Sequence, residues 1–197
     1  MTEQLIGIQK PVRRILDPDE AIAVLERAVP GLVEHRRGEP AAYDWTAAEA
    51  LGVALPADYK RLCELYPAFE LDDFLGVFLP GPQEETDWAR MACEERERWV
   101  SYADGGLVPP EVEPRNLLSW GASMEGDDFL WSTGAGGPEE WPVTVCSRNG
   151  PWWHYDGGMV QFLAELCDGT FEPWALPPVR PEVTGWWDER GVRHDVA

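Results

Sequence analysis

Apolar residues recur at helical spacing in the first third of the chain. Ile22, Leu25 and Val29 would share one face of a helix that Asp17 can cap and that Pro30-Gly31 ends. A second helix is predicted farther on, with an apolar face of four residues: Leu55, Tyr59, Leu62 and Tyr66. The arm before the first helix is either an edge strand or a loose terminus, and residues 31–43 look like a linker.

Between residues 116 and 169 the pattern changes to short apolar runs separated by turn residues. These runs predict strands over residues 117–120, 128–132, 141–146 and 152–155, and Asn149-Gly150 is the strongest hairpin signal in the chain. An amphipathic helix follows, with a stripe made of Met159, Phe162, Leu163 and Leu166. Gly169 stands where that helix should end. Earlier, residues 74–79 predict a buried strand and Pro82 opens another helix.

These elements predict an α+β fold. We expect a single domain with a mainly antiparallel sheet of about four to six strands and flanking helices. Within it, residues 1–44 form an N-terminal arm and helix, residues 45–170 form the core, and residues 171–197 form an extended tail rich in Pro and Trp. The apolar content of 44% is enough to bury a full core.

The chain is strongly acidic. It contains 36 Asp and Glu against 16 Lys and Arg, a formal net charge of −20. This excess argues against nucleic acid, whose phosphates need Lys and Arg clusters, and against anionic membrane surfaces. No signal peptide is expected, and no apolar run approaches the roughly 20 residues of a membrane span. The four Cys lack CxxC spacing, so we expect reduced thiols in a cytoplasmic protein.

No catalytic or metal-binding pattern stands out, and no cofactor is expected. None of the three His has metal-ligand spacing with another His or with Cys. Glu125, Asp127 and Asp128 could perform acid–base chemistry, hold a divalent cation or form a polar turn, and the turn is the favoured interpretation. His154 and Asp156 would share one side of a strand as a base and its orienting group, although a structural role is favoured.

The eleven Trp and the acidic groups suggest a contact surface instead. Trp120, Trp131 and Trp153 are hard to bury together in a small domain, so two or three of the Trp are expected to be partly exposed. Carboxylates around exposed aromatic rings would attract a basic protein. The candidate partner contacts are eight residues: Asp72, Asp73, Trp120, Glu125, Asp127, Asp128, Trp131 and Trp152.

Four segments carry a family resemblance. The segment LPADYKRLCELY, with Leu55, Pro56, Tyr59 and Tyr66, is followed by LLSWGASMEGDDFLWSTG, EEWPVTV and FLAELCDG. In this order they resemble the SMI1/KNR4 (SUKH) superfamily, in its actinobacterial branch, over residues 45–170. The matching positions of the later motifs are Trp120, Gly121, Gly126, Asp127, Trp131, Trp141, Pro142, Val143, Phe162, Leu163 and Gly169. The resemblance implies an α+β fold and a non-enzymatic role, in bacteria that of an immunity protein that neutralises a toxin, often a nuclease.

Three functions follow as hypotheses. The first is a cytosolic protein-binding module, specifically an immunity protein that covers a basic toxin. The second is a regulatory or scaffolding protein of the same fold. The third is a small-ligand or sugar-binding protein, or a divergent hydrolase that uses Glu125 and Asp127.

Overall fold

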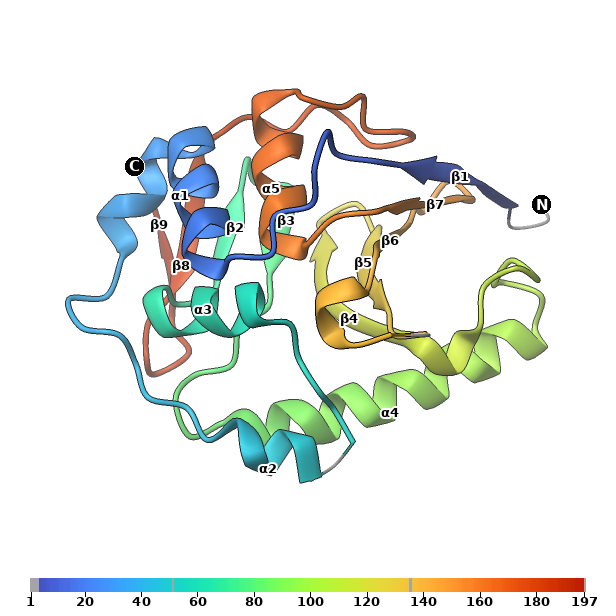
Figure 1. Cartoon of the computed structure of the whole chain (residues 1–197), viewed down its shortest axis with the longest axis horizontal. Coiled ribbons are helices and arrows are strands. Elements are labelled where there is room, and N and C mark those ends of the chain that lie inside the picture. The colour runs from blue at the N-terminus through green and yellow to red at the C-terminus, as the bar shows by residue number, and fades with distance from the viewer. Residues whose placement is uncertain (1–3, 51, 135, 197) are drawn as a thin grey trace.

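The computed structural model describes residues 4–50, 52–134 and 136–196 as one domain built on a mixed sheet of nine strands (Figure 1). The strand order is β1-β7-β6-β5-β4-β3-β2-β8-β9. The α+β class and the single domain agree with the sequence prediction, whereas the expected four to six strands are wrong. Residues 1–3, 51, 135 and 197, which fall within the predicted arm, core and tail, lie outside the described residues.

Groups of strands and groups of helices follow one another along the chain. The strands are β1 (Gln4–Gln9), β2 (Phe69–Leu71), β3 (Leu75–Val77), β4 (Leu117–Ser123), β5 (Asp128–Ser132), β6 (Val143–Cys146), β7 (Pro151–Tyr155), β8 (Val183–Trp187) and β9 (Arg193–Asp195). The α-helices are α1 (Pro18–Ala28), α2 (Trp45–Ala50), α3 (Ala57–Leu65), α4 (Glu85–Asp104) and α5 (Met159–Asp168), with short 3-10 turns η1 (Pro30–His35), η2 (Pro114–Asn116) and η3 (Pro138–Glu140).

The additional strands come from both terminal segments and from one short hairpin. β1 runs parallel to β7 at one edge, so the arm is an edge strand and the sheet is mixed. β2 pairs with β3 on one side and with β8 on the other, and β9 completes the opposite edge. The residues after 170 therefore complete the sheet, because Val183 of β8 is buried and Val196 donates its N–H to Thr184 beside the last strand pair.

Helices cover both faces of the sheet. Figure 1 shows α1, α3 and α5 together on one side, while α4 runs beneath the sheet. Along β5, Phe129 and Trp131 pack into the core under the first group, whereas Leu130 packs with Trp99 of α4. Since alternate strand residues point to opposite faces, covering both faces buries nearly every side chain of the central strands.

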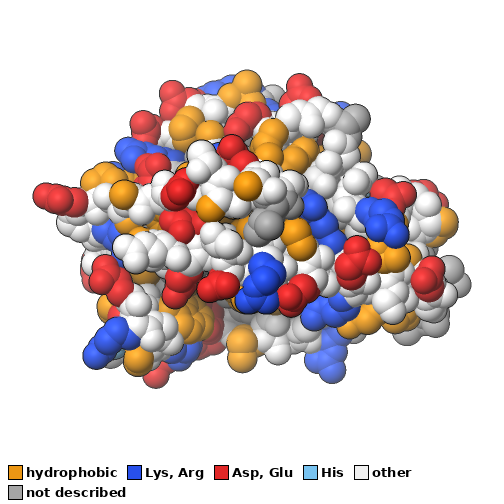
Figure 2. Space-filling model, turned by 90° about the horizontal axis from the view of Figure 1, so that it is seen from below, with side chains coloured by type: hydrophobic (Ala, Val, Ile, Leu, Met, Phe, Trp, Pro, Cys, Tyr) orange, Lys and Arg blue, Asp and Glu red, His pale blue; other side chains and the backbone are white. Residues whose placement is uncertain are grey.

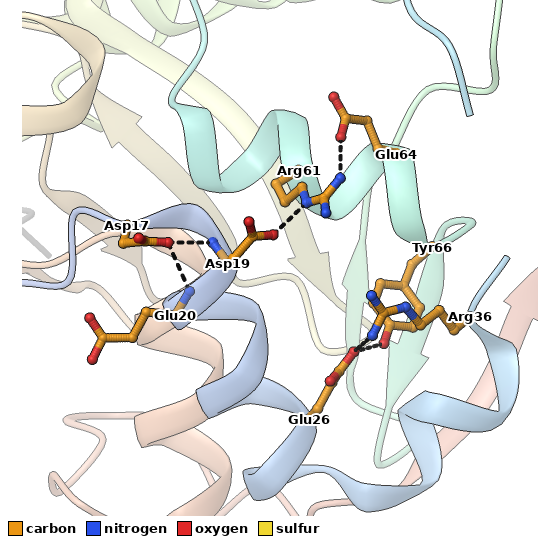
Figure 3. A network of polar contacts seen from close by, with 8 residues as sticks. All are labelled: Asp17, Asp19, Glu20, Glu26, Arg36, Arg61, Glu64 and Tyr66. Carbon is orange, nitrogen blue, oxygen red and sulfur yellow. Dashed lines mark hydrogen bonds and ion pairs between the residues drawn. The ribbon is translucent and has the colours of Figure 1, made fainter. Parts of the chain in front are cut away.

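A polar network joins α1 to α3 and to the loop after η1 (Figure 3). Asp17 caps α1 by accepting hydrogen bonds from the N–H groups of Asp19 and Glu20, as its sequence position predicted. Arg61 of α3 contacts Asp19 at 2.7 Å, and Arg36 contacts Glu26 at 2.7 Å. The Tyr66 hydroxyl donates to the same Glu26 carboxylate, so the chain is held in place directly before Arg37.

Candidate functional site

Three hairpin turns lie at the same end of the sheet. They join β2 to β3, β4 to β5, and β6 to β7, and these strand pairs are antiparallel. Met124 N donates to Phe74 O at 2.8 Å, and Arg148 Nη1 donates to Glu125 O at 2.8 Å, so neighbouring turns are in contact. The fold thus brings Asp72 and Asp73 beside Glu125 and Asp127, although some fifty residues separate them in sequence. We call this region the hairpin end.

Asp127 has a structural task within its turn. Its side chain is buried, Oδ2 accepts a hydrogen bond from Ser123 Oγ at 2.5 Å, and Oδ1 accepts one from Arg148 N at 2.9 Å. The Ser123 hydroxyl also accepts from the N–H groups of Glu125 and Asp127. Because Asp127 is engaged in this way while Glu125 points to solvent, the two do not form a paired acid and base. No group of three potential metal ligands occurs among the described residues.

The exposed groups of the hairpin end are fewer than the sequence suggested. Asp72 is tied to Arg180, whose N and Nε donate to it at 2.9 Å and 2.6 Å. Asp73 and Glu125 are exposed, and the Met124 side chain between the turns is 75% exposed. An apolar side chain flanked by two solvent-facing carboxylates therefore remains available for a partner.

Asp128 faces the other side of the sheet. It lies on the side covered by α4, where burial raises the pKa of its carboxyl to about 6. Glu95 and Asp127 add to this rise, and Arg98 opposes it. Asp128 therefore faces α4 and does not belong to the exposed surface formed by Asp73 and Glu125.

The three Trp proposed as contacts are core residues. Trp120, Trp131 and Trp152 are 0%, 1% and 0% exposed, and Trp153 is also fully buried. Trp120 packs against Phe129 and Phe162 with ring centroids 5.5 Å and 5.9 Å apart, and Trp152 meets Trp99 edge-on at 5.6 Å. The prediction that Trp120, Trp131 and Trp153 are hard to bury together is wrong, because all three lie in one core, where Trp120 and Trp153 pack against Phe162 of α5 and Trp131 packs against Tyr59 of α3.

His154 is likewise a structural residue. Its Nδ1 lies 2.9 Å from Thr144 Oγ1 on the adjacent strand, and burial lowers the pKa of the imidazole. Asp156 instead pairs with Arg14 at 3.3 Å and with Lys10 at 3.5 Å. The carboxylate that was considered as an orienting group is therefore held by cations of the N-terminal segment.

A second feature, which was not predicted from the sequence, lies at the opposite end of the sheet. A pocket of about 350 Å³ opens between the start of β2, the segment after β3 and the turn between β8 and β9. Apolar residues dominate its lining, among them Val77, Phe78, Leu79, Trp88 and Trp187. An adjoining hollow of about 430 Å³ shares Arg37, Pro67, Asp188 and Glu189 with it. Three distant segments build this site, and the only local signal was the basic run His35-Arg36-Arg37.

No family model matches the chain, and no curated protein matches it.

The structure does show what several motif residues do: a Cβ on Gly121 would lie 2.8 Å from the Gly76 carbonyl oxygen, Gly126 has a φ of +96°, and Asp127 locks the turn. The backbone therefore requires Gly121 where β3 approaches β4, and it requires Gly126 and Asp127 in the turn between β4 and β5.

No helix in the described part of the chain is long and apolar enough to cross a membrane.

Proposed function

We propose that this protein is a cytosolic protein-binding module of the SMI1/KNR4 type, and specifically an immunity protein that binds a basic toxin domain through the hairpin end. The observation that carries the proposal is the distribution of ion pairs. Most Lys and Arg side chains are already paired within the chain, for example Arg61 with Asp19, Arg90 with Glu94 and Arg193 with Glu70. Figure 2 shows such mixing of acidic and basic side chains on the face below the sheet.

Internal pairing leaves a surplus of unpaired carboxylates. The net charge of −20 is therefore borne by acidic groups such as Asp73 and Glu125, whose side chains have no ion-pair partner within the described residues. A surface of this kind accelerates encounter with a basic protein by about ten-fold or more at low salt. Met124 would then supply apolar contact area, and Met adapts readily to a partner surface.

The first experiment tests protection. The chain is expressed together with the product of the neighbouring reading frame, and cell survival is measured. We expect the chain to restore growth and to retain a basic protein at low salt that is released at high salt. The proposal fails if no neighbouring product is toxic and no basic protein is retained.

A second experiment locates the surface. Asp73→Asn combined with Glu125→Gln should lower the association rate for the captured partner several-fold at low salt and little at high salt. The matched control, Glu111→Gln with Glu172→Gln, removes the same charge at exposed positions elsewhere. Equal effects of the two double variants would show that the hairpin end is not the contact surface.

A regulatory or scaffolding role of the same fold is the second candidate. The observation that favours it is the open outer edge of β1, where Ile6 and Ile8 are 44% and 46% exposed. An edge strand can accept a further strand from another protein. A pull-down that returns only a housekeeping factor, lost on Ile6→Lys and kept in Asp73→Asn, would favour this role.

A further inference from the structure

The pocket beside Arg37 combines a buried cation with apolar walls. The Arg37 side chain is only 14% exposed, and its Nε is buried without a hydrogen-bond partner in the part of the chain that the structure describes. Its backbone N–H donates to Leu65 O at 2.8 Å, so the residue is fixed at the wall between the two hollows. Guanidinium groups stay charged, and burying one is costly unless an anion pairs with it.

The ion pair that Arg37 makes inside the chain is weak. Glu189 Oε1 lies 3.6 Å from Arg37 Nη1, beyond hydrogen-bond distance, and the Glu189 side chain is 81% exposed. A solvent-facing carboxylate at that distance gives a small fraction of the stabilisation of a bidentate pair. Nearby Asp188 does not substitute for it, because its Oδ2 accepts from Arg190 Nη2 at 2.7 Å. Arg37 is therefore left able to bind another carboxylate.

We propose that this pocket binds a small monocarboxylate with a ring-sized apolar body. The carboxylate would pair with Arg37 and displace Glu189, while the body would lie against Phe78, Trp88 and Trp187. The volume of about 350 Å³ is within the range of small-molecule sites.

Charge selects among anions of this size. Glu84, Asp188 and Glu189 line the same pocket, so a phosphate or other multiply charged ligand would meet several carboxylates for one cation. Glu84 Oε2 accepts from Gly81 N at 2.9 Å and is thereby held at the rim. One negative charge on an otherwise apolar molecule matches the single guanidinium. The pocket is at the far end of the strands from the hairpin end, so this proposal does not depend on the proposed protein-binding function.

The test compares phenylacetate with its uncharged counterpart phenylacetamide. Binding to the full chain is measured by calorimetry and by NMR, with the indole N–H signals of Trp88 and Trp187 as reporters. We expect phenylacetate to bind at least about ten-fold more tightly than the amide, since a factor of ten corresponds to about 1.4 kcal/mol. Equal affinities, or no perturbation of either indole signal at millimolar phenylacetate, would overturn the proposal.

Two substitutions and one control variant sharpen the test. Glu189→Gln removes the competing carboxylate from an exposed turn, so phenylacetate should bind several-fold more tightly while the amide is unaffected. Arg37→Gln should abolish the preference for phenylacetate, whereas Arg36→Gln, at the exposed neighbouring residue, should preserve it. If Arg37→Gln does not fold, the Glu189→Gln result decides: an unchanged or weaker affinity for phenylacetate contradicts the displacement of Glu189.

Discussion

Asp128 lies in an environment that opposes the charge of its carboxylate. Burial raises the pKa of its carboxyl from 3.8 to about 6. Between these values the folded chain keeps a proton that the unfolded chain has released, so the contribution of this group to stability is present below pH 3.8 and lost as the pH rises through about 6. We predict that Asp128→Asn raises the free energy of unfolding by about 1–3 kcal/mol at pH 7, because the amide carries no charge.

Urea unfolding across the pH range measures this effect. The gain from Asp128→Asn should shrink toward zero near pH 4, where the folded wild-type carboxyl is already protonated. Asp127→Asn is the matched control at the adjacent position. It should destabilise the chain at pH 7, because an amide cannot accept from both Ser123 Oγ and Arg148 N as the carboxylate does. A gain from Asp128→Asn that is independent of pH would contradict the assigned cause.

Trp120 allows a second prediction about a single residue, here one in the core. Its indole N–H is buried without a hydrogen-bond partner among the described residues, so replacing the ring by Phe also removes an unsatisfied donor. We predict that Trp120→Phe lowers the free energy of unfolding by about 1–2 kcal/mol and Trp120→Ala by about 3–5 kcal/mol. Chemical denaturation gives both values. Trp120→Phe should bind the captured partner like the wild type, and a large loss of binding in a folded Phe variant would contradict the core assignment.

At the level of elements, local sequence signals correctly predicted helix caps, helix ends and turns, which depend on residues that are neighbours in the chain. Asp17 caps α1, Gly169 ends α5 with a φ of +73°, and Asn149-Gly150 lies in the turn between β6 and β7 as expected. The missed strands β2 and β9 have three residues each, too few to show a period. In β8, Gly185 leaves room for the side chain of Arg193, which packs closely against it. This strand forms by pairing with β2, which lies more than a hundred residues earlier in the chain. Pairing between such distant segments leaves no local signal.

The turn between β2 and β3 is an element with stored strain. Asp72 and Asp73 both have positive φ, 56° and 49°, and they are the two central residues of a β-turn in which Phe74 N donates to Leu71 O. Gly is the favoured second residue of such a turn because it lacks a Cβ. We predict that Asp73→Gly raises the free energy of unfolding by about 0.5–1 kcal/mol, measured by thermal and chemical unfolding.

Asp72→Gly provides the contrast within the same turn. It relieves similar backbone strain but removes the carboxylate that accepts two hydrogen bonds from Arg180. The loss of this charge-assisted pair should outweigh the relief, so the variant should be less stable than the wild type. Stabilisation by Asp72→Gly together with destabilisation by Asp73→Gly would refute the interpretation of this turn.

For the whole molecule, composition predicted the sign of the surface charge but not its place. The excess of carboxylates was evident from the sequence, whereas the placement of Asp73 and Glu125 in neighbouring turns depends on the register of β3 with β4. The pocket could not be predicted, because Arg37, Phe78 and Glu189 converge only when the terminal strands close the sheet. The burial of Trp120, Trp131 and Trp153 was misjudged for the related reason that α3 and α5, which cover these rings, are brought onto the sheet only in the assembled fold.

Truncation of the terminal strands can therefore distinguish the two proposed sites by experiment. Removing residues 181–197 should open the outer edge of β2, expose Phe69 and Leu71, and destabilise the chain by several kcal/mol through lost burial around Val183. Hydrogen exchange should show lost protection of the β2 amides, and phenylacetate binding should vanish because the truncation removes Trp187 from the apolar wall of the pocket. Removing only residues 193–197, whose strand is largely exposed, should have a smaller effect. Full protection of β2 in the longer truncation would contradict the role of β8, whereas retained partner binding by the folded fraction is expected because Asp73 and Glu125 remain.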